Sequence, residues 1–299
     1  MNRNTQAHVA MIFTTLIFGM HYSIAKGLMP GSLQPMQLLF LRLLGGVVLF
    51  WLIQWFYVKE KVAPKDMLIM ALCGLLGFTL NQAFFYEGLN LTTPVDASII
   101  HVMNPVFVLV FASILIKEKV TWIKITGIAL GGGGALILIL YGKTMNMSTN
   151  SFAGNILVML NMLFYALYLV ILKPLTHKYH PMTVLKWVSL FGFLFIIPFS
   201  AHGVFNMQLQ LLDLKAWASV AYIILLNTFL AYLLINFALK IVTPTSISFY
   251  TYLQPVIASV MSVSLGNEMI TWPKIIAAVL IFSGVYLVNR HRGETVVSE

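Results

Sequence analysis

Several hydrogen-bonding side chains fall deep within long apolar stretches of this 299-residue sequence. In lipid such a side chain must find a polar partner or face water, so these positions are the first candidates for a binding site. The candidates to line a substrate cavity are Asn81, His101, Asn104, Tyr165, Tyr168, Asn227, Tyr250, Tyr252, Gln254 and His21. Amides and phenols suit a neutral or zwitterionic solute. For each residue taken alone, hydrogen bonding between neighbouring helices is the alternative.

A second group of side chains could move a proton or close a gate. Free histidine titrates near neutral pH, so either His21 or His101 could carry a coupled proton, with simple packing as the alternative. Arg42 lies inside an apolar stretch, while Asp96 and Glu87 lie near the ends of theirs, so Arg42 could pair with one of these acids as a latch. A solvated acid and a snorkelling arginine are the alternative. One histidine per stretch lacks the spacing of metal ligands, so neither a metal nor another cofactor is expected.

The composition shows what must hold these side chains in place. Hydrophobic residues make up 60% of the chain and charged residues 9%, and the mean hydropathy is +0.90. A soluble core could not bury so much apolar surface, which predicts an all-α integral membrane protein in contact with lipids. A crossing helix needs roughly 20 residues. Ten such spans are predicted, at residues 8–28, 35–58, 66–86, 94–116, 122–141, 154–175, 181–205, 214–237, 244–264 and 272–289.

The basic residues between the spans predict the orientation. With ten spans both chain ends lie on one side, and thirteen Lys and Arg fall on that side against four on the other. Lys and Arg are enriched in cytoplasmic loops, so both termini are expected in the cytoplasm, in a bacterial inner membrane. The net charge of +9 is therefore explained by topology and lipid contact, and no nucleic-acid partner is expected.

One pattern occurs twice, 150 residues apart. The pairs that match at this offset include Pro94 with Pro244, Ser98 with Ser248, Pro105 with Pro255, Glu118 with Glu268 and Gly134 with Gly284. The expected domains are a first five-helix repeat at residues 1–141, an extracytoplasmic linker at 142–153 and a second repeat at 154–299 ending in a short cytoplasmic tail. Since five is odd, the second repeat enters the membrane from the opposite side, which is the inverted topology of many carriers.

The repeated unit resembles a known family. A lysine closes the first helix, two prolines eleven residues apart mark the fourth, an acidic turn follows, and glycines lie in the last helix. This unit is similar to the EamA-like unit of the drug/metabolite transporter (DMT) superfamily. The resemblance covers nearly the whole chain, twice, and departs at Phe18 and Phe164, where the family often carries tryptophan. It implies a ten-helix transporter with a cavity lined by the first, third and fourth helices of each half.

The expected function is therefore secondary transport rather than catalysis. The protein is predicted to export or exchange a small organic solute, such as an amino acid or a drug-like compound, by alternating access at the repeat interface. An integral-membrane enzyme and a non-transporting scaffold are the alternatives. The spacing of Gly127 and Gly131 indicates close helix packing, within one subunit or in a dimer, so a monomer or weak dimer is expected.

Overall fold

The computed structural model describes residues 2–57, 60–92, 97, 100–140, 149–254, 256–257 and 272–290, and every regular element within them is helical. The long α-helices are α1 (Arg3–Leu28), α2 (Pro35–Tyr57), α7 (Trp122–Leu140), α8 (Thr149–Lys178), α9 (Pro181–Phe205) and α14 (Trp272–Arg290). The shorter α-helices are α3 (Pro64–Cys73), α4 (Asn81–Leu91), α6 (Asn104–Leu115), α10 (Leu214–Tyr222), α11 (Ala231–Ile241) and α12 (Pro244–Phe249). Two π-helical segments, η1 (Gly74–Leu80) and η3 (Ile223–Leu230), and two 3-10 turns, η2 (Leu209–Leu211) and η4 (Tyr250–Tyr252), complete the chain order.

Six continuous helical stretches of the described chain are long and apolar enough to cross a membrane. They are Arg3–Leu28, Pro35–Phe56, Pro64–Leu91, Phe152–Lys178, Pro181–Ala201 and Leu214–Ile241. Three shorter apolar helices, Asn104–Leu115, Trp122–Ile137 and Ile275–Val288, lie where further spans are predicted. The predicted fourth and ninth spans fall partly outside the described residues, so the total of ten remains a prediction. Most of the expected linker at 142–153 also lies outside them, although α8 already begins at Thr149.

Large apolar side chains cover the outside of the bundle. Trp55 is 81% exposed, Trp122 is 81% exposed and Phe205 is 89% exposed. Helices satisfy their own backbone hydrogen bonds, so lipid can cover such a surface at no cost to the backbone. The apolar surface of the folded chain thus agrees with the multi-pass membrane protein that the composition predicts.

Prolines and short polar side chains mark where helices begin. Pro35, Pro64, Pro181 and Pro244 each occupy the first position of a helix, where the missing N–H would have had no partner. At the start of α10 the Asp213 carboxylate accepts a hydrogen bond of 2.7 Å from the backbone N–H of Ala216. These local signals explain why sequence alone locates most helix starts.

Two π-helical segments interrupt the long helices at matching positions of the two repeats. In each segment a threonine hydroxyl donates to the carbonyl five residues earlier, Thr79 to Gly74 at 3.3 Å and Thr228 to Ile223 at 2.8 Å. A π-segment widens the helix locally and redirects the side chains that follow it. Asn81 directly follows η1, and Asn227 lies within η3.

In the predicted fourth and ninth spans the regular α-helix is interrupted just before the repeated proline positions, 105 and 255. Helical hydrogen bonding lapses at Val102 and Met103, immediately before α6, and η4 forms a 3-10 turn three residues before the position of Pro255. Because proline has no N–H, the carbonyl one turn earlier loses its helical partner. The interruption places His101 and Thr251 at equivalent points in the two repeats.

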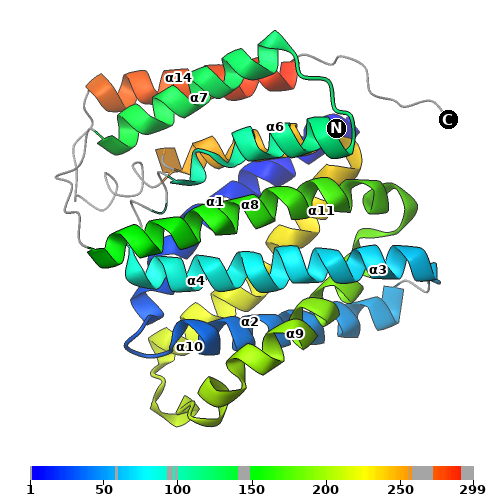
Figure 1. Ribbon diagram of the computed structural model, residues 1–299, viewed down its shortest axis with the longest axis vertical. Coiled ribbons are helices and arrows are strands. Elements are labelled where there is room, and N and C mark those ends of the chain that lie inside the picture. Colours follow the sequence, from blue (N-terminus) through cyan, green and yellow to red (C-terminus); the bar gives the residue numbers. More distant parts are fainter. Residues whose placement is uncertain are drawn as a thin grey trace.

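Glycines let α7 and α14 cross with their backbones in contact, at one edge of the bundle in Figure 1. A Cβ added at Gly134 would lie 2.7 Å from the carbonyl oxygen of Ala277, and one at Gly284 would lie 2.7 Å from the amide nitrogen of Gly131. Gly134 matches Gly284 in the repeat, and Gly127 matches Ala277. Equivalent residues of the two helices therefore make equivalent contacts at the crossing. The close packing predicted for Gly127 and Gly131 is therefore present within one chain.

A lysine near the end of the first helix of each repeat caps another helix. The Lys26 ammonium donates to the carbonyls of Leu89 at 2.7 Å, Asn90 at 2.9 Å and Thr92 at 3.1 Å, at the end of α4. In the second repeat the Lys173 ammonium donates to the carbonyls of Leu239 and Val242, at the end of α11. Leu239 and Val242 stand 150 residues after Leu89 and Thr92, so one device is built twice.

We predict that Gly284→Ala destabilises the protein because the new methyl group must push apart two backbones, an overpacking that costs about 1–3 kcal/mol. A lower melting temperature in detergent would show this. The matched control is Gly133→Ala on α7, the other helix of the crossing, since a Cβ there meets nothing within 4 Å. Equal melting temperatures of the two variants would contradict the described crossing.

We also predict that Lys173→Met lowers the melting temperature, because removing the donor leaves the carbonyls at the end of α11 unsatisfied, at about 1–3 kcal/mol. Lys215→Met removes the same charge from an exposed position at the start of α10 and serves as control. A Lys173→Met protein as stable as the control would show that the cap contributes nothing.

Candidate functional site

Helices of both repeats surround a cavity of about 80 Å³ inside the bundle. This is smaller than the roughly 300–1,000 Å³ of sites for drug-sized ligands, so it suits a small solute. The residues that line it are Phe18, His21, Tyr22, Arg42, Asn81, Gln82, Phe85, His101, Asn104, Asn161, Met162, Tyr165, Asn227, Tyr232, Thr251 and Gln254.

The structure thus brings eight of the sequence-predicted site residues to one cavity. Seven of them were predicted as cavity residues and the eighth, Arg42, as a gate. They are His21, Arg42, Asn81, His101, Asn104, Tyr165, Asn227 and Gln254.

Arg42 is the cation of the cavity wall. It extends from α2, is 3% exposed, and its Nη1 donates to Oε1 of Gln82 at 2.7 Å and to the Tyr86 hydroxyl at 3.0 Å. The guanidinium carbon lies 5.8 Å from the ring centroid of Tyr86 and 5.9 Å from that of Tyr232. Aromatic faces and neutral oxygens therefore surround the charge.

Gln82 connects Arg42 to the second repeat. Its Oε1 accepts from Arg42, and its Nε2 donates to the Tyr232 hydroxyl at 2.9 Å and to Oδ1 of Asn81. Gln82 and Tyr232 are separated by 150 residues, which makes them equivalent positions of the two repeats. Gln82 therefore hydrogen-bonds both to the buried guanidinium and to the second repeat.

A reciprocal pair of amides ties α4 to α8 at the cavity. Asn81 donates from Nδ2 to the backbone carbonyl of Asn161 at 2.9 Å, and Asn161 donates from Nδ2 to the backbone carbonyl of Asn81 at 2.7 Å. Both side chains are almost fully buried. Here the packing alternative and the cavity hypothesis both apply, because the same amides join two helices and line the cavity.

The two repeat-equivalent amides, Asn104 and Gln254, face the cavity from opposite halves. Asn104 donates from Nδ2 to the Thr251 hydroxyl at 3.2 Å, and Gln254 accepts at Oε1 from the Tyr22 hydroxyl at 3.2 Å. Each bond crosses from one repeat to the other. The amides therefore contribute to the repeat interface as well as to the cavity wall.

The two histidines both line the cavity and both pack against Phe85. His21 Nε2 is 3.1 Å from the Tyr86 hydroxyl, and His101 Nδ1 is 2.7 Å from the backbone carbonyl of Ala97. The Ala97 carbonyl can only accept, so Nδ1 of His101 donates this hydrogen bond. Tyr22 packs edge to face against His101, with ring centroids 5.2 Å apart.

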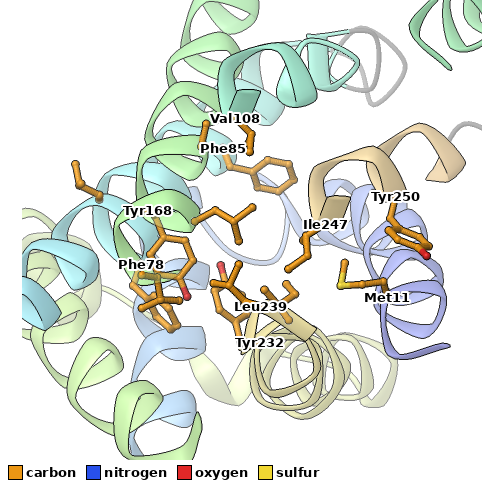
Figure 2. Close-up of a cluster of buried hydrophobic side chains, with 14 of the residues drawn as sticks. Met11, Phe78, Phe85, Val108, Tyr168, Tyr232, Leu239, Ile247 and Tyr250 are labelled. Atoms are coloured by element: carbon orange, nitrogen blue, oxygen red, sulfur yellow. The ribbon is translucent and has the colours of Figure 1, made fainter. Parts of the chain in front are cut away.

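Three tyrosines expected at the cavity lie behind it or away from it. Tyr168 is fully buried over Gly77 and packs with Phe78 and Tyr232, as Figure 2 shows. Tyr252 is buried against Gly131 of α7. The Tyr250 hydroxyl is 2.6 Å from Nδ1 of His8 in the first turns of α1. Deep position in a span could not distinguish these packing tyrosines from Tyr165, which does line the cavity.

The proposed arginine latch is not formed with Glu87. Arg42 bonds Gln82 and Tyr86 instead, and within the described part of the chain no ion pair joins it to Glu87, which is partly buried one residue further along α4. The geometric reason is helical spacing, because Tyr86 stands one turn after Gln82 on the same face and Glu87 points about 100° away. Asp96, the other expected partner, lies outside the described residues.

Several polar atoms of the cavity residues have no hydrogen-bond partner within the part of the chain that the structure describes. They are Nε of Arg42 and Oδ1 of Asn104, Asn161 and Asn227. Buried polar atoms are nearly always paired, so these orphaned atoms on cavity-lining residues point to a ligand or to ordered water. The set offers one cationic donor and three acceptors.

The structure also adds residues that the sequence analysis missed. Gln82 and Asn161 are amides deep in predicted spans and satisfied the criterion used for Asn81. Tyr22, Thr251 and Tyr232 also lie within predicted spans, but tyrosine and threonine are common in membrane helices that only pack, so position alone did not single these three out. Among the described residues no group of three or more His, Cys, Asp or Glu is arranged to hold a metal ion.

Known proteins resemble this chain over most of its length. An uncharacterized transporter of Archaeoglobus fulgidus is 27% identical over 95% of the chain and 97% of its own length. The uncharacterized transporter YxxF of Bacillus subtilis is 26% identical over 95% of the chain and 90% of its own length. A protein of Streptantibioticus cattleyicolor named "probable terminal-alkyne amino-acid exporter" is 24% identical over 77% of the chain and 76% of its own length.

The fold and the repeat are matched as well. A protein of known crystal structure that is 16% identical superposes with a TM-score of 0.74 over 96% of both chains. The EamA-like transporter family matches residues 5–140 and again residues 152–290. With both repeats matched and a polar cavity between them, the chain belongs to the EamA-like transporter family of the DMT superfamily and is a membrane transporter of small molecules.

Proposed function

We propose that the protein is a secondary carrier that moves small organic solutes, amino acids among them, by alternating access at the central cavity. The observation that carries this proposal is the polar cavity lined by residues of both repeats. A site shared between two halves can open to one side or the other when the halves rock about it. The carrier is proposed either to export its solute or to exchange one solute for another.

The proposed arrangement in the membrane is ten helices in two inverted repeats with both termini in the cytoplasm. Equivalent contacts made by the two halves support it, including the glycine crossing of α7 and α14 and the caps by Lys26 and Lys173. Under inverted topology the two lysine caps lie at opposite faces of the membrane. Each lysine cap would then stabilise the helix packing at its own membrane face when the cavity is closed to that face.

The proposed solute class is supported by the cavity and by one relative. The cavity is small, with amides and phenols among aromatic rings. The related protein of Streptantibioticus cattleyicolor is named as an exporter of an amino acid. An integral-membrane enzyme and a scaffold remain the alternatives, and the names of the relatives as transporters favour a carrier over both.

We further propose His21 and His101 as the groups through which a proton gradient would act. Both line the cavity, and each ring has a polar neighbour that fixes its orientation. A proton taken up at either ring would place a second cation near Arg42. Proton binding and solute binding would therefore influence each other.

We predict that the purified protein in liposomes shows counterflow uptake of a labelled amino acid, and that Asn104→Ala and Gln254→Ala each lower it at least tenfold. Each variant removes a buried amide at the repeat interface, a loss of about 1–3 kcal/mol when its partner is left unpaired. Gel filtration and melting temperature establish that the variants are folded.

Thr126→Ala, on the exposed face of α7, is the matched control and should transport like the wild type. Saturable uptake that neither amide variant changes would support the carrier function and would exclude the cavity from the transport pathway.

An imposed pH gradient that accelerates uptake by the wild type, but not by His21→Gln or His101→Gln, would show coupling to protons. A transport rate that does not change with the pH gradient would indicate facilitated exchange without proton coupling.

A further inference from the structure

Arg42 is a buried cation with neutral partners. Its hydrogen bonds within the described chain run from Nη1 to Gln82 and Tyr86, while Nε has none. No carboxylate of a described residue pairs with it. A guanidinium inside a membrane bundle is costly, and a few neutral acceptors compensate it only in part.

A carboxylate is the chemical group that best completes this environment. The guanidinium presents its N–H donors in a planar fork, and a carboxylate accepts two of them at once. Among the described residues that line the cavity, Arg42 is the one arginine, and none is a lysine, aspartate or glutamate. An anionic group of the solute is therefore drawn to this part of the wall.

Two of the three orphaned amide oxygens belong to side chains whose nitrogen already donates a hydrogen bond, and these two define what the rest of the solute must offer. Nδ2 of Asn104 is occupied by Thr251, and Nδ2 of Asn161 is occupied by the carbonyl of Asn81. With each nitrogen donating, Oδ1 of each amide is the atom left over, and neither has a partner. Both atoms are acceptors, so the solute must bring an N–H or O–H donor to them.

We propose that the solute is a small carboxylate with a hydrogen-bond donor at its other end, as in the zwitterion of an α-amino acid. Its carboxylate pairs with Arg42, and its ammonium donates to the amide oxygens of Asn104 and Asn161. Resting on the proposed carrier function, this assigns the charge pattern of the solute and the residues that recognise each end.

Recognition at Arg42 also reaches the contact between the repeats. A carboxylate that binds Nη1 competes with Oε1 of Gln82, and the same glutamine donates to Tyr232 in the second repeat. Binding of the solute therefore frees Gln82 from one of its partners. The Gln82–Tyr232 hydrogen bond between the two halves changes only when a solute with a carboxylate is bound. This couples binding of the solute to the rocking of the halves about the cavity.

The first test measures binding to purified wild-type protein by the rise in melting temperature, which follows ligand affinity. The probes are L-alanine, L-alaninamide and propanoate, which carry both groups, the ammonium alone and the carboxylate alone. L-Phenylalanine and its two matching analogues repeat the test with a larger side chain. The amino acids are expected to bind at least tenfold more tightly than either analogue.

Two variants then address Arg42 separately. Arg42→Gln removes the cation, and Gln82→Glu keeps nearly the same shape but places a carboxylate of the protein beside Arg42. Each is expected to weaken amino-acid binding at least tenfold and to bring acid and amide to similar affinity. Lys215→Gln removes a charge outside the cavity and should bind like the wild type. Because Gln82→Glu is nearly isosteric, it keeps the test decisive if Arg42→Gln does not fold.

The possible outcomes separate this inference from the carrier function. Equal binding of amide and acid by the wild type, or unchanged acid binding in both variants, would overturn the assignment of Arg42. Saturable counterflow of solutes without a carboxylate, with none of acids, would overturn it while the carrier stands. Selective binding of amino acids without exchange of any solute would uphold the recognition and overturn the carrier.

Discussion

The hydrogen bond between Gln82 and Tyr232 is the constraint around which the two halves are arranged. The residues occupy equivalent positions, 150 apart, in the two repeats, so the bond joins matching points of the two halves. Gln82 and Tyr232 both line the cavity, and the amides, histidines and aromatic rings beside them come from helices of both repeats.

Polar groups inside the bundle are organised by the lack of water in lipid. Unpaired groups cost several kcal/mol there, so nearly every one is tied to a neighbour. Asn81 and Asn161 exchange hydrogen bonds between two helices, and Lys26 and Lys173 cover carbonyls at helix ends. Against this background a few buried polar atoms of the described residues are unpaired, and those of Arg42, Asn104, Asn161 and Asn227 belong to residues that line the cavity.

Irregular backbone is concentrated where the cavity needs it. The π-segments η1 and η3 precede or contain Asn81 and Asn227, and the helix breaks before Pro105 and at η4 bring His101 and Thr251 to the wall. Away from the cavity the helices are regular, and glycines allow α7 and α14 to touch along their backbones. A stiff crossing at one edge and broken helices at the centre are compatible with motion of the halves about the site.

The sequence by itself determined the helical class, the repeat, most helix starts and the family, because each depends on local composition, spacing or proline placement. It also indicated most cavity amides, since polarity deep in an apolar span is visible in one dimension. Only the tertiary structure decided that Arg42 meets Gln82 and Tyr86 rather than Glu87, and that Tyr165 faces the cavity while Tyr168 packs over Gly77. Such choices depend on the rotation of each helix about its axis and on which helix lies opposite, and both are set by packing between segments far apart in the chain.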